Sequence, residues 1–147
     1  MCKRILFMML MPLVMVSCSK DDDLPPRVPV QDLREKHVEF QLYTDKTFAE
    51  ERWNEAYVKV ELAVIKRDAD GNENRIFEKT LDWVHFRDFP KLANKIIEVY
   101  DLTYDNNTEV IFVSYGVSTK IDGFLSSEGT SFSLAPEENI HLVPVRL

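Results

Sequence analysis

Cysteine is nearly absent from this chain of 147 residues. Its two cysteines, Cys2 and Cys18, lie close to the beginning, so residues 19–147 contain none. A disulfide framework, a thiolate zinc site and a cysteine nucleophile are therefore excluded for any domain formed by those residues. Such a domain must be held together by its hydrophobic core, and about 110 residues are enough for one core.

Glycine and histidine are also scarce. The four glycines stand singly, so there is no glycine-rich phosphate-binding loop, and Ser114 in Val-Ser-Tyr-Gly does not form a nucleophile elbow. His37, His85 and His141 are far apart in sequence, so they can form a zinc site only if the fold gathers them. We therefore expect no catalytic residue, no metal, no cofactor and no enzymatic activity.

Acidic residues outnumber basic residues. The chain has 18 basic and 25 acidic residues, a formal net charge of −7. Lys3 and Arg4 are the only charged residues among residues 1–17, so the net charge of residues 18–147 is −9. No basic patch is visible along the sequence. Because an acidic chain repels polyanions, we expect no nucleic-acid partner.

The beginning of the chain has the pattern of an export signal. Lys3 and Arg4 form a basic region, and residues 5–16 form an apolar stretch of 12 residues interrupted by Pro12. A membrane-spanning helix needs roughly 20 apolar residues, so this stretch is too short to be a transmembrane anchor. A processing site of small residues follows it.

That site, Met15-Val16-Ser17-Cys18, resembles the lipobox of bacterial lipoproteins. Met15 departs from the pattern, which usually has Leu, Val or Ile at this place. The resemblance implies that residues 1–17 are a signal peptide and that Cys18 carries a diacylglyceryl group, usually with a further acyl chain on its amino group. More than one acyl chain gives stable membrane anchoring. The alternative is an ordinary secretory signal with a cysteine near the cleavage site.

The next residues carry a second resemblance. Ser19-Lys20-Asp21-Asp22-Asp23 is similar to the surface-export tag of lipoproteins from the Bacteroidota, in which early acidic residues accompany transfer to the outer face of the outer membrane. The implied location is the outer membrane, with the protein displayed at the cell surface. The alternative is a plain acidic linker. Three prolines within residues 24–36 favour an extended tether, so we expect residues 18–36 to be a tether and residues 37–147 to be one domain.

Alternating apolar residues predict mainly strands after residue 36. Asp70-Gly71 favours a plain hairpin, although the oxygen-bearing side chains of Asp68–Asn74 also permit a calcium loop. Thr47-Phe48-Ala49-Glu50 has the form of a capping box, which favours a short helix over residues 48–56. Ser126–Thr130 is interpreted as a loop. The expected strands are 37–43, 57–66, 75–83, 96–102, 109–117, 132–134 and 140–147.

Seven or eight short strands with at most one short helix indicate an all-β fold. We expect a small antiparallel two-layer β-sandwich of the immunoglobulin-like or transthyretin-like kind. Phe77, Leu81 and Trp83 are predicted to face inward, because a small sandwich needs large aromatic side chains in its core. Trp53, beside charged residues, is the ring expected to be exposed and to contact a ligand.

Two classes of function remain. The first is a non-catalytic binding or adhesion module for a glycan or a protein, with an exposed aromatic patch as its mark. The second is a structural accessory subunit of a larger surface assembly, with a partner subunit at the edge strand 140–147, where Pro144 lacks an amide hydrogen. A metal-dependent hydrolase stands last, because it requires a metal or an acid pair in a cleft.

Overall fold

The computed structural model describes residues 30–48 and 51–147. The predicted signal peptide, the predicted lipidation residue Cys18, the predicted export tag Ser19–Asp23 and most of the predicted tether lie outside the described residues. The chain divides into two units, Met1–Val30 and Gln31–Leu147, and the second is the folded domain. No helix in the described part of the chain is long and apolar enough to cross a membrane.

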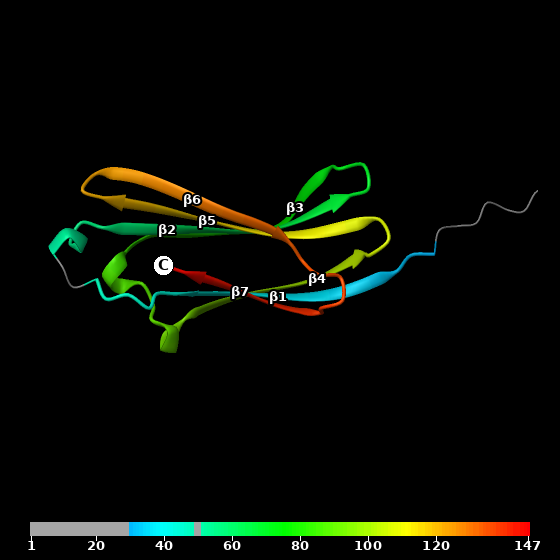
Figure 1. Ribbon diagram of the computed structural model, residues 1–147, viewed down its shortest axis with the longest axis horizontal. Coiled ribbons are helices and arrows are strands. Elements are labelled where there is room, and N and C mark those ends of the chain that lie inside the picture. The colour runs from blue at the N-terminus through cyan, green and yellow to red at the C-terminus, as the bar shows by residue number, and fades with distance from the viewer. Residues whose placement is uncertain (1–29, 49–50) are drawn as a thin grey trace, which may run out of the picture. The chain divides into compact units, whose positions relative to one another are not determined.

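The domain is an all-β sandwich of two layers, as predicted (Figure 1). A three-stranded sheet has the order β4-β1-β7, and a four-stranded sheet has the order β3-β2-β5-β6. Three short 3-10 helices, η1, η2 and η3, span Glu51–Trp53, Phe86–Asp88 and Leu92–Asn94. The strands are β1 (Leu33–Tyr43), β2 (Tyr57–Asp68), β3 (Glu73–His85), β4 (Ile96–Asp105), β5 (Glu109–Ile121), β6 (Phe124–Ser133) and β7 (Ile140–Arg146).

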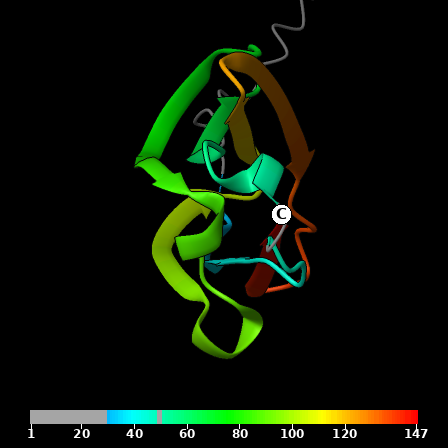
Figure 2. The same ribbon diagram turned by 90° about the vertical axis from the view of Figure 1, so that its left-hand side faces the viewer.

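The strand pairs are antiparallel except for β1 and β7, which are parallel. β4 lies opposite β3, since Lys79 Nζ contacts Glu98 Oε2 at 2.7 Å and the Tyr100 hydroxyl donates to the carbonyl of Ile76. β6 and β7 consequently form the other side of the sandwich (Figure 2). Among residues 30–48 and 51–147 the backbone of β7 pairs only with β1, so β7 is an edge strand of the described sheet, as Pro144 predicted.

The core forms where the inward faces of the two sheets meet. Alternating valines, leucines and phenylalanines on β1 and β2 lose almost all contact with solvent, as their period of two predicts. Each such side chain contributes roughly 1.5–3 kcal/mol through its burial. The fully buried members include Val38, Phe40, Leu42, Val58, Val60, Val64, Val113 and Val145.

One end of the sandwich is closed by rings rather than by the predicted helix. In place of a helix over residues 48–56, the described residues contain the 3-10 helix η1. Phe48 contacts Trp53 with ring centroids 4.9 Å apart and Phe86 at 4.8 Å. Phe86 and Phe89 are buried. Large rings thus cover the core at this end although the capping box does not start a regular helix.

Two further elements differ from the sequence prediction. β1 begins at Leu33, within the segment predicted to be tether. The predicted loop Ser126–Thr130 is instead the middle of β6, which pairs with β5 along its whole length. Asp122 and Gly123 form the tight turn between them, with φ of 50° and 83°. Two consecutive positive φ values are those of a type I′ turn, which joins two strands directly.

Candidate binding surface

The face of the four-stranded sheet turned away from the core, here called the outer face, carries a row of large side chains. His85, Tyr57, Lys120 and Leu125 are successive cross-strand neighbours on β3, β2, β5 and β6. Opposite residues of antiparallel strands share a face, so this row crosses the whole sheet. The rings of Tyr57 and His85 are in contact, with centroids 4.1 Å apart, which fixes the position of the tyrosine.

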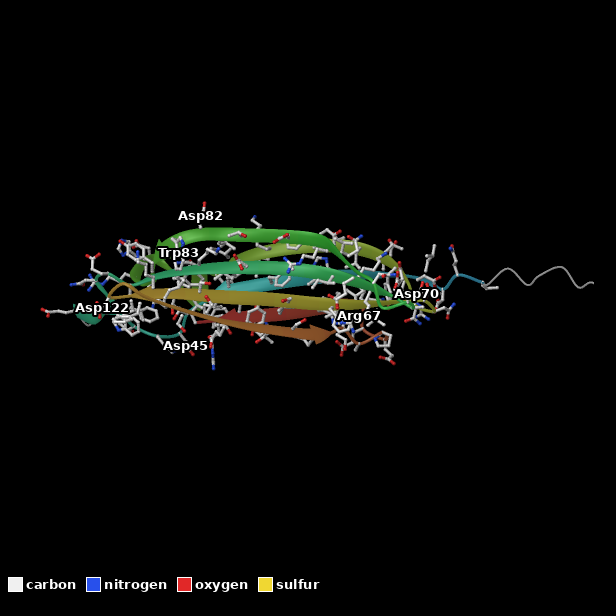
Figure 3. The ribbon with its side chains drawn as sticks, turned by 90° about the horizontal axis from the view of Figure 1, so that it is seen from above. Asp45, Arg67, Asp70, Asp82, Trp83 and Asp122 are labelled. Carbon is white, nitrogen blue, oxygen red and sulfur yellow. The ribbon has the colours of Figure 1, made fainter. Side chains whose placement is uncertain are left out.

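A β-bulge adds Trp83 to this face. Val58 pairs with Val84 and Val60 with Leu81, so Lys59 alone stands opposite both Asp82 and Trp83. The extra residue in β3 shifts the alternation by one. Trp83, predicted to be in the core, is therefore 42% exposed, and that prediction was wrong. Figure 3 shows Asp82 and Trp83 next to each other on β3.

Tyr57, Trp83 and Lys120 line a pocket of about 260 Å³. Its walls are two aromatic rings and one long aliphatic stem that ends in an ammonium group. Lys120 is exposed and forms no ion pair within the described residues, whereas the neighbouring Lys59 contacts Glu61 at 2.6 Å. An apolar pocket with one available polar group has the usual composition of a small-ligand site, although its volume lies just below the usual range of about 300–1,000 Å³.

The outer face becomes flat and hydroxyl-rich beside this pocket. Ser118 and Ser127 are cross-strand neighbours whose hydroxyl oxygens lie 2.9 Å apart. Gly116 and Gly129 form the next pair, and a shallow hollow of about 150 Å³ lies over them. Ser114 and Ser131 form the pair after that. We call this strip the serine–glycine lane, and it extends from the aromatic pocket along β5 and β6.

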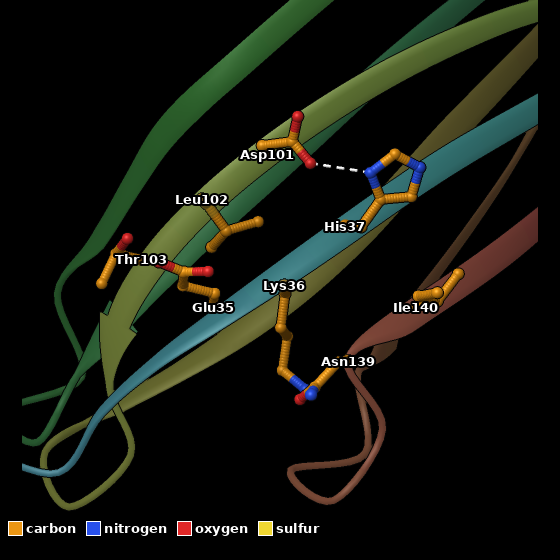
Figure 4. A pocket seen from close by; sticks show the side chains of 8 residues that line it. All are labelled: Glu35, Lys36, His37, Asp101, Leu102, Thr103, Asn139 and Ile140. Carbon is orange, nitrogen blue, oxygen red and sulfur yellow. Dashed lines mark hydrogen bonds and ion pairs between the residues drawn. The ribbon is translucent and has the colours of Figure 1, made fainter.

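A larger hollow, of about 440 Å³, lies on the three-stranded sheet (Figure 4). His37 Nδ1 lies 2.7 Å from Asp101 Oδ1 across β1 and β4, as the dashed line in Figure 4 marks. The remaining lining residues, Glu35 and Thr103 among them, are mostly polar, and no phenylalanine, tyrosine or tryptophan lines the hollow. The imidazole of His37 and the carboxylate of Asp101 engage each other, and this hollow lacks the stacking surface that Tyr57 and Trp83 give the aromatic pocket.

A buried polar cluster lies beneath the same end of the three-stranded sheet. The Lys36 ammonium is 3% exposed and donates to the carbonyls of Ala135 and Glu138, both at 2.6 Å. His141 Nε2 lies 3.2 Å from it. Burial lowers the pKa of Lys36. Burial, and then the charge of Lys36, lowers the pKa of His141. This cluster joins β1 to the loop before β7, and its polar groups are bonded to one another.

The fold does not gather the three histidines. His37 lies on the outer side of β1, His141 lies in the interior, and His85 lies against Tyr57. Within the described residues no three His, Cys, Asp or Glu side chains could hold a metal ion together. Trp53 is half-buried against Phe48 and Phe86, and its contact with a ligand stays a prediction.

The loop after β2 is a hairpin connection. Asp68 accepts hydrogen bonds from the backbone amides of Asp70 and Asn72 and from the side-chain amide of Asn72, at 2.9–3.0 Å. These bonds lower the pKa of the Asp68 carboxyl. Gly71 has φ of 86°, which glycine adopts without strain. The carboxylate of Asp68 thus closes a hairpin turn. The sequence favours this hairpin over a calcium loop.

The aromatic pocket and the serine–glycine lane were not found in the sequence. Asp122-Gly123 was the signal for β6, since Asp-Gly between two strands is typical of a type I′ hairpin. Nothing in the sequence of β3 marks its bulge. No protein-family model, no curated protein and no solved structure matches the chain.

Proposed function

We propose that this protein is a surface-anchored, non-catalytic binding module that holds a glycan on the outer face of its four-stranded sheet. The aromatic pocket of Tyr57, Trp83 and Lys120, continued by the serine–glycine lane, is the observation that supports this function most directly. Exposed large rings grouped in a concavity are rare on a protein surface that binds nothing.

Sugar chains match both the aromatic pocket and the serine–glycine lane. The face of a sugar ring that carries C–H groups packs on an aromatic ring, and Trp83 offers an exposed ring for this contact. The next sugar units would lie over the lane, where serine hydroxyls donate and accept hydrogen bonds. Lys120 can donate to a hydroxyl or a carboxylate of the ring held in the pocket. A flat lane also admits a long chain, which a closed pocket would not.

The binding test uses the fact that the chain has two tryptophans. In a Trp53→Phe variant, Trp83 is the sole indole fluorophore. Linear hexasaccharides of glucose, xylose and mannose serve as probes, and the binding sugar should change the Trp83 emission in a saturable way. A Trp83→Ala variant should lose that sugar in calorimetry, while Trp53→Phe retains it. Absence of binding by every probe in both assays would count against a glycan ligand.

Anchoring rests on the resemblances at Cys18 and Ser19–Asp23. We propose a lipid on Cys18, outer-membrane location and cell-surface display, with the sandwich carried on the proline-rich tether. Cys18→Ala should release the protein from the membrane fraction, and retention of the variant there would contradict lipidation. Deleting residues 20–23 should keep the protein lipidated but protect it from external protease. Unchanged protease sensitivity would contradict the surface tag.

A second candidate function is that of a structural accessory subunit. The unpaired edge of β7 favours it, since a free edge is where another chain adds a strand. This role does not compete with sugar binding, because the edge and the outer face of the four-stranded sheet are different surfaces.

A further inference from the structure

The two sheets differ by one strand, and the difference leaves one side of the sandwich open. Three strands face four, and β4 lies opposite β3, so the unmatched strand is β6. All ten residues of β6 are exposed. β6 therefore projects beyond the three-stranded sheet, and no part of the described chain covers its inward face.

Strand register identifies the side chains on that uncovered face. Phe132 is opposite Val113 and Glu128 is opposite Val117, and both valines belong to the core. Phe132, Glu128 and the intervening Thr130 consequently point inward, toward the position that a fourth strand of the smaller sheet would occupy. Phe132 is 40% exposed, and Glu128 forms no ion pair among the described residues.

β7 presents an unpaired backbone edge to the same space. The amide of His37 donates to the carbonyl of Asn139, and the amide of Leu147 donates to the carbonyl of Tyr43. Successive residues of a strand direct their amide and carbonyl groups to opposite sides. The odd-numbered residues of β7 thus direct these groups toward β1, and the even-numbered residues direct theirs toward the free edge. The outward groups are the amides of Ile140, Leu142 and Arg146 and the carbonyls of Ile140, Leu142, Pro144 and Arg146.

A groove of about 390 Å³ lies beside the free edge of β7. Tyr43, Pro144 and Arg146 line it from the smaller sheet, and Tyr115 lines it from β5. Its walls combine two phenol rings and a proline with the guanidinium of Arg146, which also contacts Asp45. A strand placed against the free edge of β7 would pass along this groove and would cover the inward face of β6.

We propose that the open side between β6 and β7 is a strand-acceptor site, which takes one extended segment of another protein as the fourth strand of the smaller sheet. The segment has apolar side chains at alternate positions, which contact Phe132 and Tyr115, and a basic side chain at the position that faces Glu128. Backbone bonds to β7 hold it, and the side-chain pattern selects it. The site is separate from the glycan-binding surface. It binds the partner that the role of an accessory subunit requires.

The carboxylate of Glu128 argues against a second copy of this chain as the occupant. The strand with which a second sandwich could fill the gap is its own β6, since β6 is the one that projects. Glu128 lies near the middle of β6 (Phe124–Ser133), so a two-fold axis through the middle of that strand would place Glu128 of one copy against Glu128 of the other between the sheets. Two like charges in a partly buried space repel, whereas a basic residue of a foreign strand neutralises the carboxylate.

The test adds a strand to the full chain, purified from membranes in detergent. An Asn-Gly turn and a strand about as long as β7 are fused after Leu147, with valines and one lysine facing β6 and threonines facing solvent. We expect the exchange of the Leu142 amide, which faces outward, to slow by about tenfold or more. The Val143 amide, already directed toward β1, should change little.

Two matched fusions check the mechanism. Glutamate in place of the added lysine should weaken the protection of Leu142, and prolines at the positions whose amides face β7 should abolish it. Equal exchange of the Leu142 amide in the lysine and proline fusions would overturn the proposal. An unfused chain that is dimeric by light scattering, and that the lysine fusion makes monomeric, would overturn it in favour of a second copy. Sugar binding should be the same in the unfused chain and in all the fusions, so strand acceptance and glycan binding are tested separately.

Discussion

The Nζ atom of Lys36 lies 3.2 Å from Nε2 of His141 inside the sandwich. Two potential cations are thus neighbours in a place that water scarcely reaches, since His141 is 8% exposed. A neutral His141 with its proton on Nδ1 can accept a hydrogen bond from the ammonium at Nε2, whereas a protonated one cannot and instead donates to the carbonyl of Glu138, 2.9 Å away. Burial and the charge of Lys36 both lower the pKa of His141, and the carbonyl and carboxylate of Glu138 oppose them only in part.

The first prediction concerns acid stability. Because the pKa of His141 is lower in the folded chain than its ordinary value of 6.5, the unfolded state binds its proton first. The free energy of unfolding contributed by this group is therefore complete above pH 6.5 and is lost as pH falls through the folded pKa. The loss has a slope of at most about 1.4 kcal/mol per pH unit. Urea denaturation between pH 7.5 and 4.5 measures it, and His141→Gln should flatten the profile.

The second prediction concerns the lysine of the same cluster. Lys36→Met leaves the carbonyls of Ala135 and Glu138 without their donor, and we expect a loss of about 2–4 kcal/mol in the free energy of unfolding. Lys79→Met is the matched control, because the Lys79–Glu98 pair lies at the surface and contributes about 1 kcal/mol or less. Equal losses in the two variants would show that the buried cluster contributes no more to stability than a surface ion pair.

The third prediction separates the two tryptophans. Trp53→Ala should lower the free energy of unfolding by about 2 kcal/mol or more, since its ring packs against Phe48 and Phe86 at the end of the core. Trp83→Ala should cost about 1 kcal/mol or less, because much of its ring already faces water. Chemical denaturation measures both. The opposite ranking would mean that Trp83, rather than Trp53, supports the core.

The fourth prediction concerns the turn before β6. Gly123 has φ of 83°, and a Cβ there would contact nothing within 4 Å, so Gly123→Ala isolates the cost of a left-handed backbone. We expect a loss of about 1–2 kcal/mol in stability. Gly129→Ala, at ordinary φ with its nearest contact at 3.6 Å, should be neutral or slightly stabilising. Thermal unfolding of the two variants side by side measures the difference.

The fifth prediction concerns the serine–glycine lane. Gly129 has room for a side chain on the outer face, so Gly129→Gln should fold normally and obstruct the lane. We expect sugar binding to weaken by about tenfold or more. Calorimetry with the sugar that binds best measures it. Full affinity in this variant would restrict the binding surface to the aromatic pocket.

The sequence by itself determined most of the strands and the buried face of β1, but it missed most of β6. In β1 the apolar residues Val38, Phe40 and Leu42 alternate with polar ones, and residues two apart in a strand share a face, so all three point inward as predicted. Pro144 likewise predicted an edge, because a residue without an amide hydrogen cannot donate to a second neighbour.

The tertiary structure alone decided where the candidate sites lie. Trp83 continues the inward alternation of β3 in the sequence, and only pairing with β2 creates the bulge that turns it outward. The open side between β6 and β7 depends on how three strands are placed against four, which no local pattern encodes. Alternation fixes the face of a residue relative to its own strand, but a binding site depends on what the neighbouring strands leave uncovered.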